Sequence, residues 1–185
     1  MTRKEENTAV EVLKTFATAA VLAFGIRTFV AEARYIPTSS MEPTLEINDH
    51  LIIEKISYLV RSPQRGDVVV FSPTETLKKQ KFKDAFIKRV IGLPEDTVEI
   101  KGGKVYVNNQ VLTEKYIGEA PKYQYGPVTV PEDQYLVLGD NRNNSYDSHY
   151  WGFVPRKNLI GQAIVRYWPL NRLGGLNDQP FYNSK

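Results

Sequence analysis

The chain has 185 residues, a net charge of +3 and no cysteine. Its length suits one domain of ordinary size, and the balance of 24 basic against 21 acidic side chains gives no reason to expect a nucleic-acid partner. The lack of cysteine excludes disulfides, thiolate metal ligands and cysteine nucleophiles. His50 and His149 are the only histidines, so a serine hydrolase built on this chain has few imidazoles to act as its base.

An apolar stretch follows a polar N-terminus. Residues 1–14 carry charges of both signs, whereas residues from Thr15 to Ala31 are apolar or small except for Arg27. As a helix, this stretch would be about 25 Å long, slightly shorter than the roughly 30 Å core of a bilayer. Arg27 lies near its far end, where a long side chain reaches the headgroups. We therefore predict a cytoplasmic tail over residues 1–14 and a membrane anchor over residues 15–31.

Two other interpretations of this stretch remain open. A cleavable signal peptide also has an apolar core, and Ala31-Glu32-Ala33 fits its small-x-small exit. The shortness of the run is also typical of a buried helix in a soluble domain. Basic residues flank both ends, so their count does not decide the orientation of an anchor.

Three hydroxyl residues in a row come directly after the apolar stretch. The segment Tyr35–Leu45 reads Tyr-Ile-Pro-Thr-Ser-Ser-Met-Glu-Pro-Thr-Leu. Pro37 and Pro43 disfavour a helix here, because each fixes its own φ and pushes the preceding residue toward extended geometry. Such a segment could present a nucleophilic serine at a bilayer surface, or it could be a plain Ser/Thr-rich turn.

The rest of the chain has the pattern of short β-strands. Gly102-Gly103 and Asn108-Asn109 are typical two-residue hairpin turns, and no long amphipathic helix is expected after residue 33. We predict a mostly β domain of short antiparallel strands over residues 35–170, followed by a loose tail over residues 171–185. The expected strands lie within Asp49–Glu54, Gly66–Phe71, Ala85–Ile91, Thr97–Leu112, Leu136–Leu138 and Ile160–Trp168.

Motifs for phosphate and metal binding are incomplete. Gly102-Gly103-Lys104 lacks the first glycine of a phosphate loop, and Val105 replaces its Ser/Thr. Asp140–Ser148 is rich in oxygen ligands, yet Arg142 occupies a ligand position and the glycine of a calcium loop is missing. The two histidines are far apart, which makes a zinc site unexpected. The sequence therefore predicts neither a metal nor a cofactor.

With so few histidines, lysine is the natural partner for a nucleophilic serine. A serine needs a base within hydrogen-bond reach, and Lys88 shares a predicted strand face with Phe86 and Val90. Burial among apolar neighbours disfavours the charged ammonium, so the amine could be neutral near pH 7 to 8 and act as a base. Alternatively, Lys88 is a gatekeeper that points to solvent from an edge strand.

Four stretches, in this order along the chain, resemble the type I signal peptidases, which are membrane-anchored serine proteases that remove signal peptides from exported proteins. With the apolar N-terminal stretch, the resemblance covers nearly the whole chain, and four ordered motifs are far more specific than any one. The stretches are IPTSSMEPTL (36–45), RGDVVVF (65–71), IKRVIGLP (87–94) and GDNRNNSYDS (139–148), which continues to WGFVP (151–155).

The resemblance implies a role for each matching residue. Ser40, directly before the methionine, matches the nucleophile, and Lys88 matches the general base. Thr38 and the backbone N–H of Ser40 match the donors that bind the oxyanion, and Ser145 matches a hydroxyl that orients the lysine amine. Ser39 matches a position where the family often has a small residue.

Two supporting sets follow from the same resemblance. The substrate-pocket candidates, which could equally be plain core residues, are Ile36, Pro37, Met41, Ile87 and Leu138. The residues expected to hold the catalytic strands in place are Arg89, Gly139, Asp140, Asn144 and Asp147.

The chain departs from the family pattern at two positions. His149 stands where an arginine commonly pairs with the aspartate at 147, so its pairing with Asp147 would depend on pH. Glu95 stands where glycine is usual, so we expect its backbone to avoid positive φ. The short stretch from Thr97 to Gln134 resembles the compact members of the family.

The implied function is removal of signal peptides after small residues, of the Ala-x-Ala type, by a single-pass membrane protein. The expected partners are preproteins, the lipid bilayer and the export machinery. The N-terminus would be cytoplasmic and the catalytic domain would face the exported side of a bacterial plasma membrane or an internal membrane such as the thylakoid. Open alternatives are an inactive β domain that binds preproteins, a self-cleaving Ser/Lys peptidase of related fold, and the mitochondrial branch of the peptidases.

Overall fold

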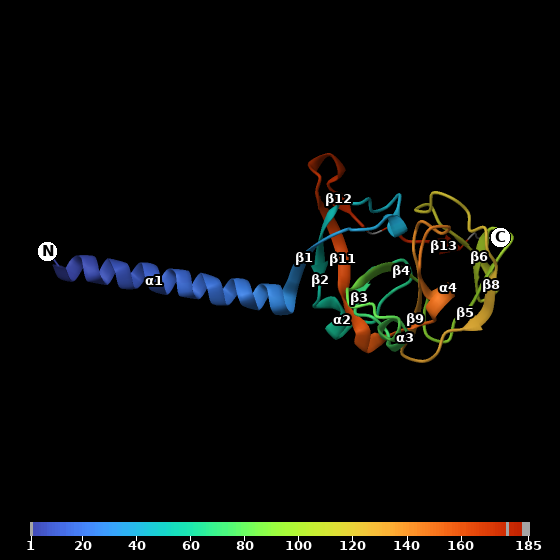
Figure 1. The fold of residues 1–185 in the computed structure, drawn as a ribbon, viewed down its shortest axis with the longest axis horizontal. Helices are drawn as coiled ribbons and strands as arrows, with labels where there is room; N and C mark the ends of the chain where they lie inside the picture. The colour runs from blue at the N-terminus through green and yellow to red at the C-terminus, as the bar shows by residue number, and fades with distance from the viewer. Residues whose placement is uncertain (1, 177, 183–185) are drawn as a thin grey trace.

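A long helix leaves one side of a β domain in the computed structural model, which describes residues 2–176 and 178–182 (Figure 1). Helix α1 (Thr2–Gly25) continues as a π-helical stretch, η1 (Ile26–Val30). Within it, the 23 residues Thr8–Val30 have a mean hydropathy of 1.7 and are long and apolar enough to cross a membrane. The helix thus extends beyond the predicted run 15–31 at its N-terminal end, and the apolar part spans about 34 Å.

The apolar side chains of this helix do not pack on the β domain. Leu13, Phe16 and Val21 are 70%, 69% and 71% exposed. A contiguous apolar surface of this kind is rare on a soluble protein and marks a region that a membrane or another protein covers. The helix is therefore not the core helix of a soluble domain, which was one of the open interpretations.

Within the described residues, the strands form an eight-stranded and a five-stranded antiparallel sheet. The larger sheet has the order β1-β2-β11-β3-β4-β9-β10, with β12 beside β11, and the smaller has the order β13-β7-β6-β5-β8. The strands of the larger sheet are β1 (Ala31–Tyr35), β2 (His50–Glu54), β3 (Val68–Phe71), β4 (Phe86–Gly92), β9 (Gln134–Leu138), β10 (Val154–Pro155), β11 (Leu159–Trp168) and β12 (Gly174–Gly175). Those of the smaller sheet are β5 (Thr97–Lys101), β6 (Lys104–Val107), β7 (Gln110–Thr113), β8 (Tyr125–Thr129) and β13 (Phe181–Tyr182).

The helices after η1 are short. The α-helical turns are α2 (Ser57–Val60), α3 (Glu75–Lys79) and α4 (Ser148–Trp151). The 3₁₀ turns are η2 (Ser39–Met41), η3 (Arg156–Asn158) and η4 (Leu170–Arg172). The mostly β fold with one long N-terminal apolar helix is confirmed.

Local sequence signals placed the hairpins correctly. Gly102 and Gly103 join β5 to β6, and Asn108 and Asn109 join β6 to β7; all four residues have positive φ. Positive φ at both central residues is what a type I′ hairpin requires, because its twist matches that of the flanking strands.

Glu95 corrects one expectation. Its φ is +70°, although a side chain with a β-carbon disfavours that region. Neighbouring contacts impose the turn: the Glu95 N–H donates to the Val130 carbonyl at 2.9 Å, and the Asp96 carboxylate accepts from the Leu93 N–H at 2.7 Å. These bonds outweigh the local preference of the residue.

The C-terminal segment also differs from the expected loose tail. Gly174–Gly175 pairs with β11 and Phe181–Tyr182 pairs with β7, while Leu176 is 3% exposed. Glycine, asparagine and proline suggested a loop. The segment instead pairs with the part of β11 that extends beyond β3 and with β7, which would otherwise be the edge of the smaller sheet.

Candidate active site

The segment that carries the serines is fixed on both sides by buried apolar residues. Ile36 and Met41 are 2% and 0% exposed and belong to one core cluster with Leu45 and Leu51. Between them, Thr38 is extended (φ −136°, ψ 157°) and the chain then turns into η2. The hydroxyl residues are therefore presented by a segment whose apolar neighbours anchor it to the core.

Ser40 and Lys88 are in direct contact. The Lys88 Nζ donates to the Ser40 Oγ at 2.8 Å and to the Ile87 carbonyl at 2.9 Å. Lys88 lies in β4, between β3 and β9 in the larger sheet, and only 4% of it is exposed. A central, buried lysine is not an edge-strand gatekeeper, so that alternative is excluded.

Burial changes the titration of this lysine. Desolvation lowers the pKa of Lys88 from 10.5 to about 8, while the charges of Asp147 and Asp140 act in the opposite direction. The Phe86 ring centroid lies 5.9 Å from the Nζ, as expected for two residues on one strand face. An amine with this pKa is neutral in a useful fraction of molecules near neutral pH, which a general base requires.

Ser39 has a different environment. Its hydroxyl accepts a hydrogen bond from the Asn144 Nδ2 at 3.0 Å, and its carbonyl accepts from the Asn141 Nδ2 at 3.1 Å. The Asn141 backbone N–H also donates to the Ser40 carbonyl at 3.2 Å. These bonds hold η2 against the loop after β9. The Ser39 hydroxyl bonds to Asn144 in that loop, and the hydroxyl that contacts Lys88 is that of Ser40.

The other two predicted hydroxyl residues, Thr38 and Ser145, differ in whether their hydroxyls contact the Ser40–Lys88 pair. The Thr38 Oγ1 is 3.3 Å from the Ser40 Oγ, within hydrogen-bond distance, and its oxyanion role stays a prediction. The Ser145 Oγ is buried and has no hydrogen-bond partner among the described residues, so the structure holds no Ser145–Lys88 hydrogen bond. The orienting role of Ser145 stays a prediction.

Gly139 lies against both the Ser145 hydroxyl and the Ser40 carbonyl. A β-carbon at this position would lie 2.2 Å from the Ser145 Oγ and 2.4 Å from the Ser40 carbonyl oxygen. Both distances are far below van der Waals contact, so the close approach of the loop to the serine requires glycine here.

Three further predicted residues form the frame of the site. Arg89 binds Asp140 through two hydrogen bonds of 2.8 and 2.6 Å. Asp147 accepts from the Gly139 N–H at 2.9 Å and lies 2.7 Å from the His149 Nδ1. The departure at position 149 therefore preserves a polar contact with the aspartate.

Residues that were not predicted from the sequence complete this frame. Thr44 donates to Asp140 at 2.6 Å, and Arg142 forms a buried two-pronged pair with Glu114, with bonds of 2.7 and 2.5 Å. Asn141 was also missed. Thr44, Asn141 and Arg142 lie inside the two motifs already singled out, which is the signal that could have found them, whereas Glu114 carries none.

A hollow of about 290 Å³ extends along the segment before the serines and the start of β4. Three of the five predicted pocket residues line it, namely Ile36, Pro37 and Ile87. Met41 and Leu138 are 0% exposed and belong to core clusters, so they do not line this hollow. The described residues hold no group of three or more His, Cys, Asp or Glu placed to bind a metal ion.

Comparison with known proteins identifies the family. The family described as "Signal peptidase, peptidase S26" matches residues 9–168. The "Probable signal peptidase I-2" of Synechocystis sp. is 68% identical over 173 residues, which cover 94% of this chain and 79% of that protein. "Signal peptidase I" of Leptolyngbya laminosa is 61% identical over 181 residues, which cover 97% of this chain and 89% of that protein.

A chloroplast protein is a more distant relative. The "Probable thylakoidal processing peptidase 2, chloroplastic" of Arabidopsis thaliana is 40% identical over 172 residues, which cover 92% of this chain and 47% of that protein. The family match spans most of the chain, and identity to the cyanobacterial proteins is high over nearly all of it. The chain therefore belongs to the signal peptidase I family of peptidases, S26.

Proposed function

We propose that this protein removes signal peptides from exported preproteins, with Ser40 as nucleophile and Lys88 as general base. The observation that carries the proposal is the 2.8 Å contact between the Lys88 Nζ and the Ser40 Oγ, made by a lysine that is almost fully buried. A serine is a weak nucleophile until a base takes its proton, and Lys88 is the base within reach.

The reaction proceeds in two halves. Neutral Lys88 takes the proton of Ser40 as its Oγ attacks the scissile carbonyl, and the Thr38 hydroxyl and the Ser40 N–H stabilise the resulting oxyanion. One such donor typically contributes about 3–4 kcal/mol to transition-state stabilisation. The protonated lysine then gives its proton to the leaving amine, an acyl-enzyme forms on Ser40, and water releases it with Lys88 again as base.

The hollow beside the serine segment supports binding of an apolar substrate side chain before the cleavage site. Its lining includes Ile36, Pro37 and Ile87, which is next to Lys88 in the chain, together with the charged Arg34 and Asp84. The apolar side chains in this lining disfavour a polar side chain of the substrate, because its desolvation would not be compensated by hydrogen bonds. We assign to this hollow the recognition of a small residue in an Ala-x-Ala signal.

The helix Thr8–Val30 anchors the protein in the membrane that also holds the apolar part of the signal peptide, which brings enzyme and substrate together. A cleavable leader fits poorly, because a cut after Ala33 would divide strand β1, which pairs with β2 along its whole length. The N-terminus is assigned to the cytoplasm and the β domain to the exported side. The name of one relative, a thylakoidal processing peptidase, favours a thylakoid membrane as one location.

Cleavage of a preprotein by the detergent-solubilised full chain tests the function. The substrate carries a signal peptide ending in Ala-x-Ala, and gel analysis with N-terminal sequencing locates the cut. Wild type and Ser39→Ala should cleave after the second alanine. Ser40→Ala and Lys88→Met should lose roughly 10⁴- to 10⁶-fold in kcat, as expected when one member of a catalytic unit is removed.

Other outcomes identify the alternatives. Binding of the preprotein by wild type without cleavage would replace catalysis with a binding function. Loss of activity in Ser39→Ala with an active Ser40→Ala would move the nucleophile to the neighbouring serine. A nicked chain with an intact preprotein would indicate self-cleavage.

A further inference from the structure

The segment that follows strand β7 contributes two buried side chains to the frame of the candidate active site. Glu114 and Tyr116 come directly after Thr113, the last residue of β7. The side chain of Glu114 is 3% exposed, and Tyr116 is 5% exposed. Strand β7 belongs to the smaller sheet, whereas Lys88 lies in the larger one. Through this segment, the smaller sheet therefore reaches the surroundings of the catalytic pair.

Glu114 binds the arginine of the loop after β9. Its two carboxylate oxygens accept from the Arg142 Nη1 and Nη2 at 2.7 and 2.5 Å. The Tyr116 hydroxyl donates to one of the same oxygens at 2.7 Å. Arg142 is 1% exposed, and a charge buried so deeply is strongly destabilising without its partner. Glu114 is therefore the counter-ion that this arginine needs.

Five side chains close a ring of contacts around the loop. The Tyr116 ring lies over the Arg89 guanidinium, with 3.8 Å between the Cζ and the ring centroid. Arg89 pairs with Asp140, which comes two residues before Arg142 in the chain. A cation on a desolvated aromatic face gains up to about 2 kcal/mol. The ring, closed by Glu114, thus joins the segment after β7, strand β4 and the loop after β9.

Arg142 connects this ring to Gly139. The Arg142 Nε donates to the Gly139 carbonyl at 3.1 Å, and the Gly139 N–H donates to Asp147 at 2.9 Å. Both backbone polar groups of the glycine are therefore bound. Because Gly139 packs against the Ser40 carbonyl and the Ser145 hydroxyl, a displacement of the glycine would also displace the serine.

We propose that Glu114 is a positioning residue for the cleavage reaction, which holds Gly139 against Ser40 through Arg142. The inference rests on the proposed function and assigns to the smaller sheet a part in it. The Glu114 carboxylate binds Arg142 and Tyr116, so it acts on the serine through geometry. Misplacement of a reacting group by roughly 1 Å costs about 10²-fold in rate, so loss of the two-pronged bond should be visible in kcat.

Kinetics of preprotein cleavage by the detergent-solubilised full chain test this role. Arg142→Lys keeps the positive charge, but a lysine cannot replace the planar fork that binds Glu114 and Gly139 together. Glu114→Gln removes the negative charge with little change of size. Both variants should lower kcat by about 10- to 100-fold. KM should change little, because none of the five ring residues lines the hollow assigned to the substrate side chain.

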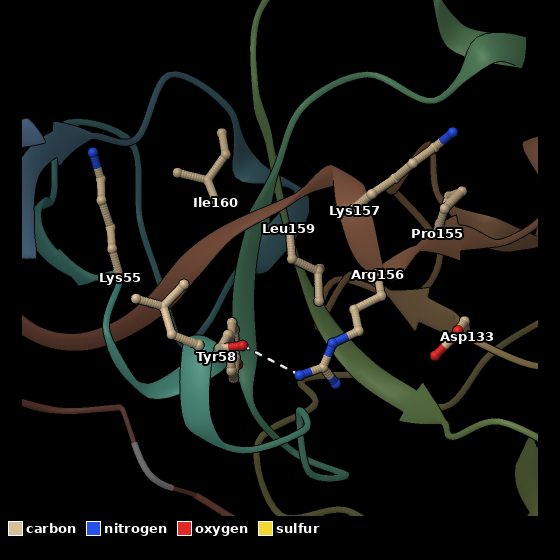
Figure 2. A pocket seen from close by; sticks show the side chains of 9 residues that line it. Lys55, Tyr58, Asp133, Pro155, Arg156, Lys157, Leu159 and Ile160 are labelled. Atoms are coloured by element: carbon tan, nitrogen blue, oxygen red, sulfur yellow. Dashed lines mark hydrogen bonds between the residues drawn. The ribbon is translucent and has the colours of Figure 1, made fainter. Parts of the chain in front are cut away.

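Arg156 supplies a matched control. Like Arg142, it holds backbone carbonyls, namely those of Tyr58 and Arg61 at 3.2 and 3.1 Å. Figure 2 shows the bond to Tyr58 beside a hollow of about 510 Å³. These carbonyls lie in and just after α2 (Ser57–Val60) rather than in the loop that packs on the serine. Arg156→Lys should therefore retain the kcat and KM of wild type.

A double variant separates positioning from stability. Glu114→Gln alone leaves the Arg142 charge buried without its counter-ion and should lower the midpoint of chemical unfolding. Glu114→Gln combined with Arg142→Met removes both charges and should recover most of that midpoint. Its kcat should stay low, because methionine cannot donate to the Gly139 carbonyl. Recovery of kcat together with the midpoint would overturn the positioning role and leave only a structural one.

The remaining outcomes are equally decisive. Wild-type kcat in both Arg142→Lys and Glu114→Gln would overturn the inference, while cleavage by wild type would still support the proposed function. A loss of kcat in Arg156→Lys as large as that in Arg142→Lys would trace the effect to general destabilisation and overturn the inference as well. Absence of cleavage by folded wild type would overturn the proposed function, and the positioning role with it.

Discussion

Arg89, one residue after Lys88 in β4, and Asp140 form a two-pronged ion pair that is fully buried. The bonds measure 2.8 and 2.6 Å, and both side chains are 0% exposed. Thr44, four residues after Ser40, donates to the same carboxylate. One buried carboxylate thus connects the lysine strand, the serine segment and the loop after β9, which are distant in sequence.

Asp140→Ala should destabilise the protein by about 3–5 kcal/mol, because it leaves the Arg89 charge buried without a counter-ion. Glu119→Ala, which breaks the exposed Lys122–Glu119 pair, should change stability little. Chemical unfolding of both variants in detergent measures the difference. Similar midpoints for the two would mean that solvent or another group compensates Arg89.

Activity should fall as the pH drops below about 8. Burial lowers the pKa of Lys88 to about 8, and only the neutral amine accepts the Ser40 proton, so kcat/KM should decrease by about tenfold per pH unit on the acid side. The pH profile of preprotein cleavage checks this. A flat rate from about pH 9 to about pH 5 would rule out lysine as the base.

Lys88→Met should make the folded protein more stable while removing its activity. Burial of the Lys88 ammonium destabilises the folded state. The shift of its pKa from 10.5 to about 8 corresponds to a loss of roughly 3 kcal/mol in the free energy of unfolding. This penalty is fully present below pH 8, where Lys88 is charged in both states, and disappears as the pH rises toward 10.5.

Thermal unfolding of Lys88→Met should therefore give a higher midpoint than wild type at pH 7, with the advantage shrinking above pH 8. Lys104→Met, at an exposed position, serves as the control and should show no such dependence. A lower midpoint for Lys88→Met at pH 7 would mean that the lysine's hydrogen bonds outweigh its desolvation.

Gly139→Ala should reduce kcat by about 10²-fold or more, the cost of moving a reacting group by roughly 1 Å. The added methyl group would clash with the Ser40 carbonyl at 2.4 Å and displace Ser40, the proposed nucleophile. Gly118→Ala meets only Pro43, at 3.5 Å, and should retain activity. Steady-state cleavage rates compare the two, and equal rates would show that the loop can move without disturbing the serine.

His149→Ala should lower stability by about 1–3 kcal/mol, because the buried Asp147 carboxylate loses the partner at 2.7 Å. His149→Arg should restore the pairing. An arginine guanidinium can donate hydrogen bonds to the same carboxylate, so the arginine variant should be about as stable as wild type. Unfolding curves of the three proteins test this, and an alanine variant as stable as wild type would show that Asp147 does not depend on its contact with His149.

Much of the fold follows from local sequence alone. Runs of β-branched residues such as Val68–Phe71 marked strands, and Gly102-Gly103 and Asn108-Asn109 marked hairpins, because strand alternation and positive φ are properties of a few adjacent residues. The apolar run marked the long helix. The candidate nucleophile and base came from ordered motifs, in which spacing carries the information.

Tertiary structure decided what depends on residues far apart in the chain. Strand order put Lys88 in the middle of a sheet rather than at its edge, and desolvation there sets its pKa. Long-range contacts imposed positive φ on Glu95 and paired the C-terminal segment with both sheets. They also bring the Ser40 hydroxyl to Lys88 and the Ser39 hydroxyl to Asn144, which agrees with the motif that singled out Ser40 by its place before Met41.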